Sequence, residues 1–93
     1  MSEVQYSEFV NKLKAQDYLE ISRRLSHPEV IDALHALIGL TSEVGELADA
    51  LKKHVFYGQP VDVPNVHEEL GDVRWYYQLM ANAFEFDTQE IKR

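Results

Sequence analysis

The sequence predicts an all-α protein, a helical bundle built on an antiparallel helix hairpin and completed by self-association. Two observations indicate this class: apolar residues recur at helical spacing, and no stretch alternates cleanly at period two. Only four glycines and three prolines interrupt the pattern. The 93 residues suffice for one domain, taken as 1–93, and so short a chain buries a modest share of its surface, which favours self-association.

The first helical stretch is expected from Glu3 to Leu25. Its apolar pattern falters at Lys14–Asp17, where Asp17 and Glu20 resemble a capping box, which allows a break there. The expected core positions of this stretch are Phe9, Val10, Leu13, Ile21 and Leu25.

A long helix is expected to follow and to end near Tyr57. Ser26 is the expected N-cap, Pro28 suits the first turn, and Glu29 is placed to reach back to the cap. Gly58 can take the left-handed conformation that closes a helix.

The next segment, Gln59–Pro64, is expected to be a stiff loop, with Asn65 as the N-cap of a third helix. So short a loop between two long helices requires an antiparallel hairpin. Asp87–Glu90 predicts the start of a fourth helix, which would stop at Arg93 after less than two turns. Because so short a helix is marginal alone, we expect the native chain to continue.

Composition excludes several classes of function. The formal charge of −7 argues against nucleic acid and anionic membranes as partners, because both require a basic surface. The absence of cysteine excludes disulfides, thiolate catalysis and Cys-ligated zinc. No run of about 18 apolar residues and no secretory signal occurs, so a cytoplasmic location is expected.

A short acidic motif occurs twice in the sequence and contains the candidate catalytic residues. Residues 42–47 read Ser-Glu-Val-Gly-Glu-Leu, and residues 68–73 read Glu-Glu-Leu-Gly-Asp-Val. In each, two acids stand three residues apart and share one helix face. The glycine between them is unfavourable in a helix, and its repetition suggests close helix approach or room beside the carboxylates.

The hairpin would turn Glu43 and Glu46 toward Glu69 and Asp72. Four converging carboxylates repel one another, so a cation is expected between them. Oxygen ligands favour hard ions, which makes Mg²⁺ the expected cofactor and Mn²⁺ a substitute. Di-iron bundles use Glu-x-x-His pairs, which this chain lacks, so that alternative is set aside.

Two further residues are candidate substrate contacts. Lys53 lies two helical turns beyond Glu46, where it could bind an anionic ligand or form a salt bridge with an acid. Tyr76 shares the face of Glu69 and Asp72, although adjacent aromatic residues are more often core or interface than base-stacking groups.

The stretches Gly39–Lys53 and Glu68–Tyr76 resemble the MazG-like nucleoside triphosphate pyrophosphohydrolases, whose signature is Glu-x-x-Glu, a spacer and Glu-x-x-Asp. The resemblance covers roughly Pro28 to Asp87. It implies an all-α enzyme that cleaves nucleoside triphosphates between the α and β phosphates and clears unwanted nucleotides. It further implies that the matching acids hold Mg²⁺ and orient the attacking water, and that the protein forms a homodimer or homotetramer. These acids are Glu43, Glu46, Glu69 and Asp72.

Two features depart from that family's pattern. Many relatives have an extra Glu where this chain has Ser42, and many continue past the fourth helix with an Asn and basic residues. The residues leave open which carboxylate is the general base, how many metal ions bind and which base and sugar are preferred. Two other functions stay open: a non-enzymatic helical interaction module with solvated acids, and a sensor that holds metal or nucleotide without cleaving it.

Overall fold

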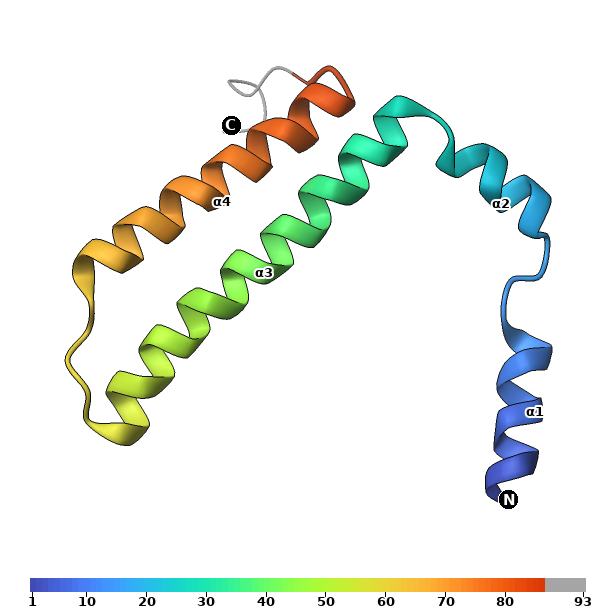
Figure 1. Ribbon diagram of the computed structural model, residues 1–93, viewed down its shortest axis with the longest axis horizontal. Helices are drawn as coiled ribbons and strands as arrows, with labels where there is room; N and C mark the ends of the chain where they lie inside the picture. Colours follow the sequence, from blue (N-terminus) through green and yellow to red (C-terminus); the bar gives the residue numbers. More distant parts are fainter. Residues whose placement is uncertain (87–93) are drawn as a thin grey trace.

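The computed structural model of the chain describes residues 1–86, which are helical and contain no strand (Figure 1). The helices in this range are α1 (Glu3–Leu13), α2 (Tyr18–Leu25), α3 (Pro28–Tyr57) and α4 (Val63–Ala83). The all-α prediction is therefore confirmed. None of these helices is both long enough and apolar enough to cross a bilayer. The helix start expected at Asp87–Glu90 lies outside the described residues.

The predicted hairpin is formed by α3 and α4, which run antiparallel and side by side (Figure 1). α3 ends where the sequence indicates. Gly58 has a left-handed φ of 71°, and its N–H donates to the carbonyl of His54 at 3.1 Å. Glycine takes this conformation without the steric penalty that a Cβ would bring.

α4 begins earlier than predicted. The side chain of Asp62 accepts a hydrogen bond from the N–H of Asn65 at 3.1 Å, so Asp62 is the N-cap and the assignment of that role to Asn65 is wrong. Pro64, expected in the loop, lies in the first turn of the helix. A proline is tolerated there because the first N–H groups of a helix need no intrahelical acceptor.

The N-cap predicted for α3 is also wrong. Ser26 has helical backbone angles and its hydroxyl donates to the carbonyl of Arg23 at 2.6 Å, so it closes α2. His27, in an extended conformation, is the N-cap of α3 and makes no side-chain capping bond. Pro28 explains the difference, because a proline disfavours helical angles in the residue before it.

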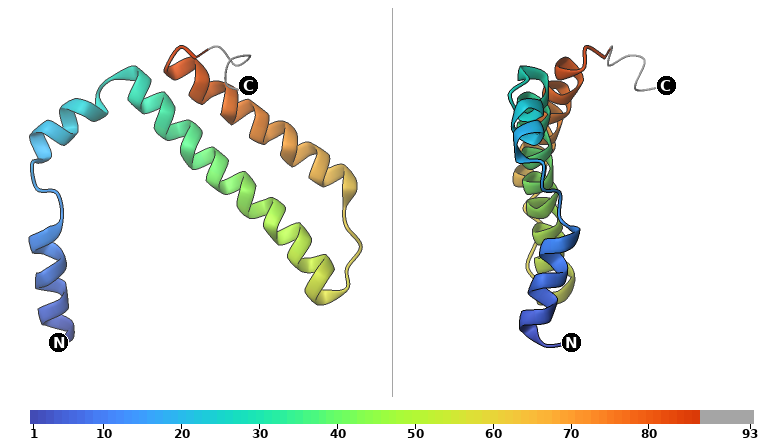
Figure 2. Two further views of the ribbon diagram at one scale, coloured as in Figure 1. Left: turned by 180° about the vertical axis from the view of Figure 1, so that it is seen from behind. Right: turned by 90° about the vertical axis from the view of Figure 1, so that its right-hand side faces the viewer.

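The N-terminal stretch forms an arm that leads away from the hairpin (Figures 1 and 2). The break allowed at Lys14–Asp17 is present, and Asp17 caps α2 by accepting from the N–H of Glu20 at 3.2 Å. Neither α1 nor α2 has a buried residue. The core positions predicted here are therefore wrong for the single chain: Ile21 is half-buried and the others are exposed.

Small side chains form the contact between the two long helices. Ala36 and Ala81 are 0% and 2% exposed, and Gly39 is also buried. The chain is open as a whole, with a radius of gyration of 19.1 Å. A compact domain of this length has a radius of about 12 Å. The hairpin buries one charged side chain between its helices, that of Glu69. Many large apolar side chains of the described chain stay exposed.

Candidate functional site

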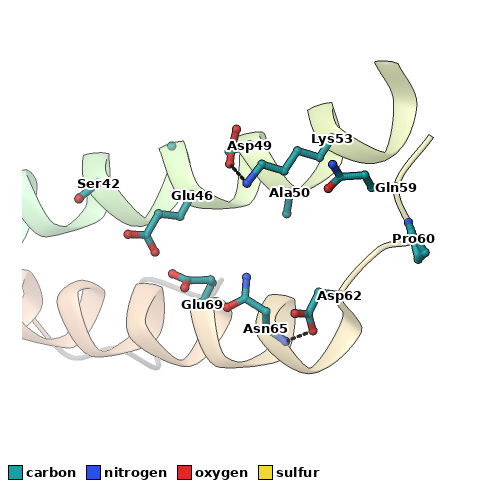
Figure 3. Close-up of a pocket in the computed structure, with 11 residues that line it drawn as sticks. Ser42, Glu46, Asp49, Ala50, Lys53, Gln59, Pro60, Asp62, Asn65 and Glu69 are labelled. Atoms are coloured by element: carbon teal, nitrogen blue, oxygen red, sulfur yellow. Dashed lines mark hydrogen bonds and ion pairs between the residues drawn. The ribbon is translucent and has the colours of Figure 1, made fainter. Parts of the chain in front are cut away.

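Four carboxylates from the two helices of the hairpin meet. Glu43 and Glu46 belong to α3, and Glu69 and Asp72 belong to α4. The antiparallel packing turns the two pairs toward each other, as the sequence predicts. Carboxylate oxygens of Glu43, Glu69 and Asp72 all lie within 4.8 Å of one another. Figure 3 shows the side chains of Glu46 and Glu69 pointing toward each other from opposite helices.

The cluster is partly withdrawn from water. Glu69 is 9% exposed and Glu43 is half-buried. The Oε2 atom of each is buried and has no hydrogen-bond partner among residues 1–86. Among residues 1–86, the salt bridges join other side chains, so none of them neutralises these acids.

These observations test whether the residues suit a metal ion. A buried carboxylate oxygen without a partner is unfavourable, and a bound cation removes that cost. Carboxylate oxygens are ligands that Mg²⁺ and Mn²⁺ prefer. The unpartnered atoms of Glu43 and Glu69, with Asp72 beside them, therefore fit a divalent cation.

Crowding also changes how the acids bind protons. Close contact with the Glu69 carboxyl raises the pKa of Glu46 above its ordinary value, and the charges of Glu69 and Asp72 add to this effect. Contact with the Glu43 carboxyl raises the pKa of Glu69, and burial acts in the same direction. Like charges held this close favour a shared proton when no cation is present.

A cavity of about 520 Å³ adjoins the acids and extends to the loop of the hairpin (Figure 3). Its volume suits a small-molecule ligand. Glu46 and Glu69 lie at one end, and Gln59 and Pro60 lie at the other. The other lining residues are Ser42, Gly45, Asp49, Ala50, Lys53, Asp62 and Asn65.

Lys53 lines this cavity and forms a salt bridge there. Its Nζ lies 2.9 Å from Oδ2 of Asp49, which confirms one of the two alternatives that the sequence allows. Asp49 raises the pKa of Lys53, and Lys53 lowers the pKa of Asp49. Both side chains are about half exposed, so solvent screens the pair and an anionic ligand can compete for the lysine.

Tyr76 does not line the cavity. Its ring packs against Gly39 of α3, where a Cβ would overlap it. Edge-on contacts surround the ring, with centroid distances of 5.2 Å to Trp75 and 6.0 Å to His35. The site residues named from the sequence thus fall in two places, with the acids and Lys53 together and Tyr76 farther along the hairpin.

Comparison with known families adds to this geometry. The profile of the MazG nucleotide pyrophosphohydrolase domain matches residues 29–92, which is more than half of the chain and includes both acid pairs. The chain belongs to this family. The MazG match supports nucleotide pyrophosphohydrolase activity, the hydrolysis of an acid anhydride, and a general dependence on divalent metal. Searches of curated proteins and of solved structures found no match.

The departure from the MazG pattern at Ser42 falls on the site itself, since Ser42 lines the cavity. A serine there places a hydroxyl, and not a carboxylate, on this part of the cavity wall. The acids on the wall are Glu46 and Glu69 of the motif pairs together with Asp49, which is paired with Lys53, and Asp62.

No functional role was predicted from the sequence for the residues that line the cavity near the hairpin loop. Asn65 lies one helical turn before Glu69, a spacing that puts both residues on one face of α4, and it lines the cavity although the sequence gives it no role beyond a helix cap. Gln59 and Pro60 carry no such signal, because a loop's position depends on how it closes the hairpin. The ring Nδ1 of His54 donates to the carbonyl of Gln59 at 2.8 Å and fixes the loop there.

The glycines of the repeated acidic motif have different surroundings. Gly45 lines the cavity, and a Cβ built on it would meet no heavy atom within 4 Å, so it leaves room beside Glu46. Gly71 also faces open space in the single chain. The close helix approach suggested for this pair occurs instead at Gly39.

Proposed function

We propose that this chain is a Mg²⁺-dependent nucleoside triphosphate pyrophosphohydrolase, with Mn²⁺ as a substitute, that clears unwanted (d)NTPs from the cytoplasmic nucleotide pool. The observation that carries the proposal is the pair of buried, unpartnered carboxylate oxygens on Glu43 and Glu69 beside a cavity of ligand size. A solvated acidic face would leave such oxygens exposed to water.

The four acids are proposed as metal ligands and catalytic groups. Glu43, Glu69 and Asp72 are close enough to share a cation, and Glu46 adjoins them on the cavity wall. When bound, a divalent ion supplies positive charge that lets an acidic site accept phosphates and polarises the phosphorus–oxygen bonds.

Glu46 is the acid that we assign as proton acceptor. It lies on the cavity wall, and the neighbouring carboxylates raise its pKa, which makes it a stronger proton acceptor than an isolated glutamate. A water oxygen forms a bond to the α phosphorus, and the bond from that phosphorus to the bridging oxygen breaks. Pyrophosphate leaves with the bonding electrons, the water proton passes to Glu46, and (d)NMP remains.

The two candidate substrate contacts have different support. Lys53 lies on the cavity wall and is proposed to exchange Asp49 for a phosphate oxygen when substrate enters. Tyr76 is proposed to contact the nucleoside from its place beyond Asp72, one helical turn farther along α4.

Self-association into a homodimer or homotetramer completes the proposal, with the whole chain, residues 1–93, as one domain. The support is the open shape of the described chain and its exposed apolar residues. On α3 alone these include Leu37 and Ile38, which are 52% and 68% exposed. A second copy would cover such surface and stabilise a chain that buries little by itself.

The test of the activity is incubation with a panel of standard and modified (d)NTPs and Mg²⁺, followed by product analysis. The expected products are the monophosphate and pyrophosphate in equal amounts, with no turnover in EDTA or in Asp72→Asn. A chain that is stabilised by Mg²⁺ and binds nucleotide but releases no product would be a sensor. A chain whose melting temperature does not respond to Mg²⁺ would be an interaction module.

A further inference from the structure

The acid cluster depends on how α3 and α4 lie against each other, because each helix supplies two of the acids. One helical turn before Glu43, Gly39 is buried at the contact between the helices. One helical turn after Asp72, the ring of Tyr76 lies on that glycine. The contact of Gly39 with Tyr76 is thus one turn away from the cluster on both helices.

The fit at this point leaves no room for another atom. A Cβ built on Gly39 would overlap three carbons of the Tyr76 ring, whereas a Cβ on Gly45 or on Gly71 would meet no heavy atom of the described residues within 4 Å. Glycine is unfavourable inside a helix, so its place at this contact is explained by packing.

Two aromatic rings lie beside the Tyr76 ring at this contact. Trp75 and His35 both meet it edge-on, with centroid distances of 5.2 Å and 6.0 Å. Ala36, one turn before the glycine on the same face of α3, is fully buried. A side chain added at position 39 therefore requires the ring of Tyr76, or the helix that carries it, to shift.

We propose that Gly39 is a positioning residue, which seats the ring of Tyr76 and so holds Asp72 of α4 in register with Glu43 of α3 for metal binding. This inference rests on the proposed metal site. It assigns Gly39 no contact with substrate or metal.

The test compares Gly39→Ala with Gly71→Ala, a matched control in α4 with open space around it. Both changes replace glycine by a better helix former. A loss of Mg²⁺ affinity that occurs in Gly39→Ala and not in Gly71→Ala is therefore due to the contact with Tyr76. The readouts are the Mg²⁺ concentration for half-maximal thermal stabilisation, measured without nucleotide, and the melting temperature in EDTA. We expect Gly39→Ala to need at least about tenfold more Mg²⁺, the size seen when groups that orient metal ligands are lost, and Gly71→Ala to match the wild type.

Two variants of the partner keep the test decisive if Gly39→Ala fails to fold. Tyr76→Leu removes the ring and is expected to raise the Mg²⁺ requirement as well, whereas Tyr76→Phe keeps the ring and the wild-type requirement. In Gly39→Ala/Tyr76→Leu the combined effect should be smaller than the sum of the single effects, because the two residues act through one contact.

A lower melting temperature with an unchanged Mg²⁺ requirement in Gly39→Ala or in Tyr76→Leu would show a merely structural contact and overturn the proposal. Because this measurement contains no nucleotide, it stands even if the wild type proves unable to hydrolyse any (d)NTP. That second result would overturn the proposed function alone.

Discussion

Oε2 of Glu43 and Oε2 of Glu69, on opposite helices of the hairpin, are both buried and find no hydrogen-bond partner in the part of the chain that the structure describes. Carboxylate oxygens of the two residues lie within 4.8 Å of each other. Two acids in this arrangement repel each other unless a proton or a cation lies between them. The folded chain therefore keeps an unfavourable pair of charges at the point where its two acidic motifs meet.

The first prediction concerns this repulsion. Changing Glu69 to Gln keeps the size of the side chain and removes one charge, so the melting temperature in EDTA should rise. The stabilisation by Mg²⁺ that the wild type shows should be lost, and turnover should fall by at least ~100-fold, as expected when a group that stabilises the transition state is removed. Thermal unfolding with and without Mg²⁺ and steady-state kinetics measure these effects.

Glu68→Gln is the matched control, because Glu68 is adjacent in sequence, exposed and outside the cluster. It should retain both the Mg²⁺ response and the activity of the wild type. If Glu69→Gln behaved like Glu68→Gln, the acids would not form a metal site.

The second prediction concerns pH. The pKa values of Glu46 and Glu69 are raised above the ordinary 4.5, so above that value the folded apoprotein holds more protons than the unfolded chain. The free energy of unfolding should therefore decrease as pH rises from about 4.5 through the raised values. Melting curves in EDTA across this range test whether stability falls with pH, and the fall should be smaller in Glu46→Gln than in the wild type. If the stability of the wild type and of Glu46→Gln rose by the same amount through this range, the raised pKa values of the two acids would be contradicted.

The third prediction distinguishes the effect of Lys53 on nucleotide binding from that of its salt-bridge partner Asp49. Lys53→Met removes a cation from the cavity wall, so KM for the nucleotide should rise by about tenfold, the usual size for a lost charged hydrogen bond, while Mg²⁺ affinity is unchanged. Asp49→Asn releases the lysine from its salt bridge, so KM should stay the same or fall. An equal rise of KM in both variants would indicate that the pair acts only as a structural salt bridge.

The fourth prediction concerns assembly. The described chain buries few large apolar side chains, so a particle of two or four times 10.8 kDa is expected in sedimentation at micromolar concentration. Leu37→Glu places a charge on an exposed apolar surface of α3 and should shift the equilibrium toward the monomer. Lys52→Glu, an exposed polar position of the same helix, is the control for added negative charge. A wild type that sediments only as a monomer would refute the assembly.

The sequence predicts the hairpin because its determinants are local. Helical spacing over α3 and α4, the left-handed Gly58 and the short loop are all properties of neighbouring residues. The two repeated acid motifs place their carboxylates on one face of each helix for the same reason, and the hairpin then requires them to meet.

The errors at the helix starts also have local causes. Ser26 and Asn65 are both good capping residues by type, but a proline lies close to each in the chain. Pro28 makes the residue before it extended, which moves the cap of α3 to His27. Pro64 is accepted in a first turn, which lets α4 begin at Val63 under the cap of Asp62.

Other features depend on contacts between distant residues and were not predictable. Nothing near Gly39 in the sequence indicates that the ring of Tyr76 would lie on it. The apolar spacing of α1 predicts a buried face, yet within residues 1–86 both Phe9 and Leu13 are exposed. Amphipathic spacing indicates which face can be buried, but not whether the partner belongs to the same chain.

One measurement tests the central claim most directly: hydrolysis of a nucleoside triphosphate by the wild-type chain with Mg²⁺ in water enriched in oxygen-18, followed by mass analysis of both products. Attack by water on the α phosphorus places one labelled oxygen in the (d)NMP and none in the pyrophosphate, and Asp72→Asn should give neither product above background. Label in the pyrophosphate, release of single phosphates, or equal turnover by Asp72→Asn would contradict the account.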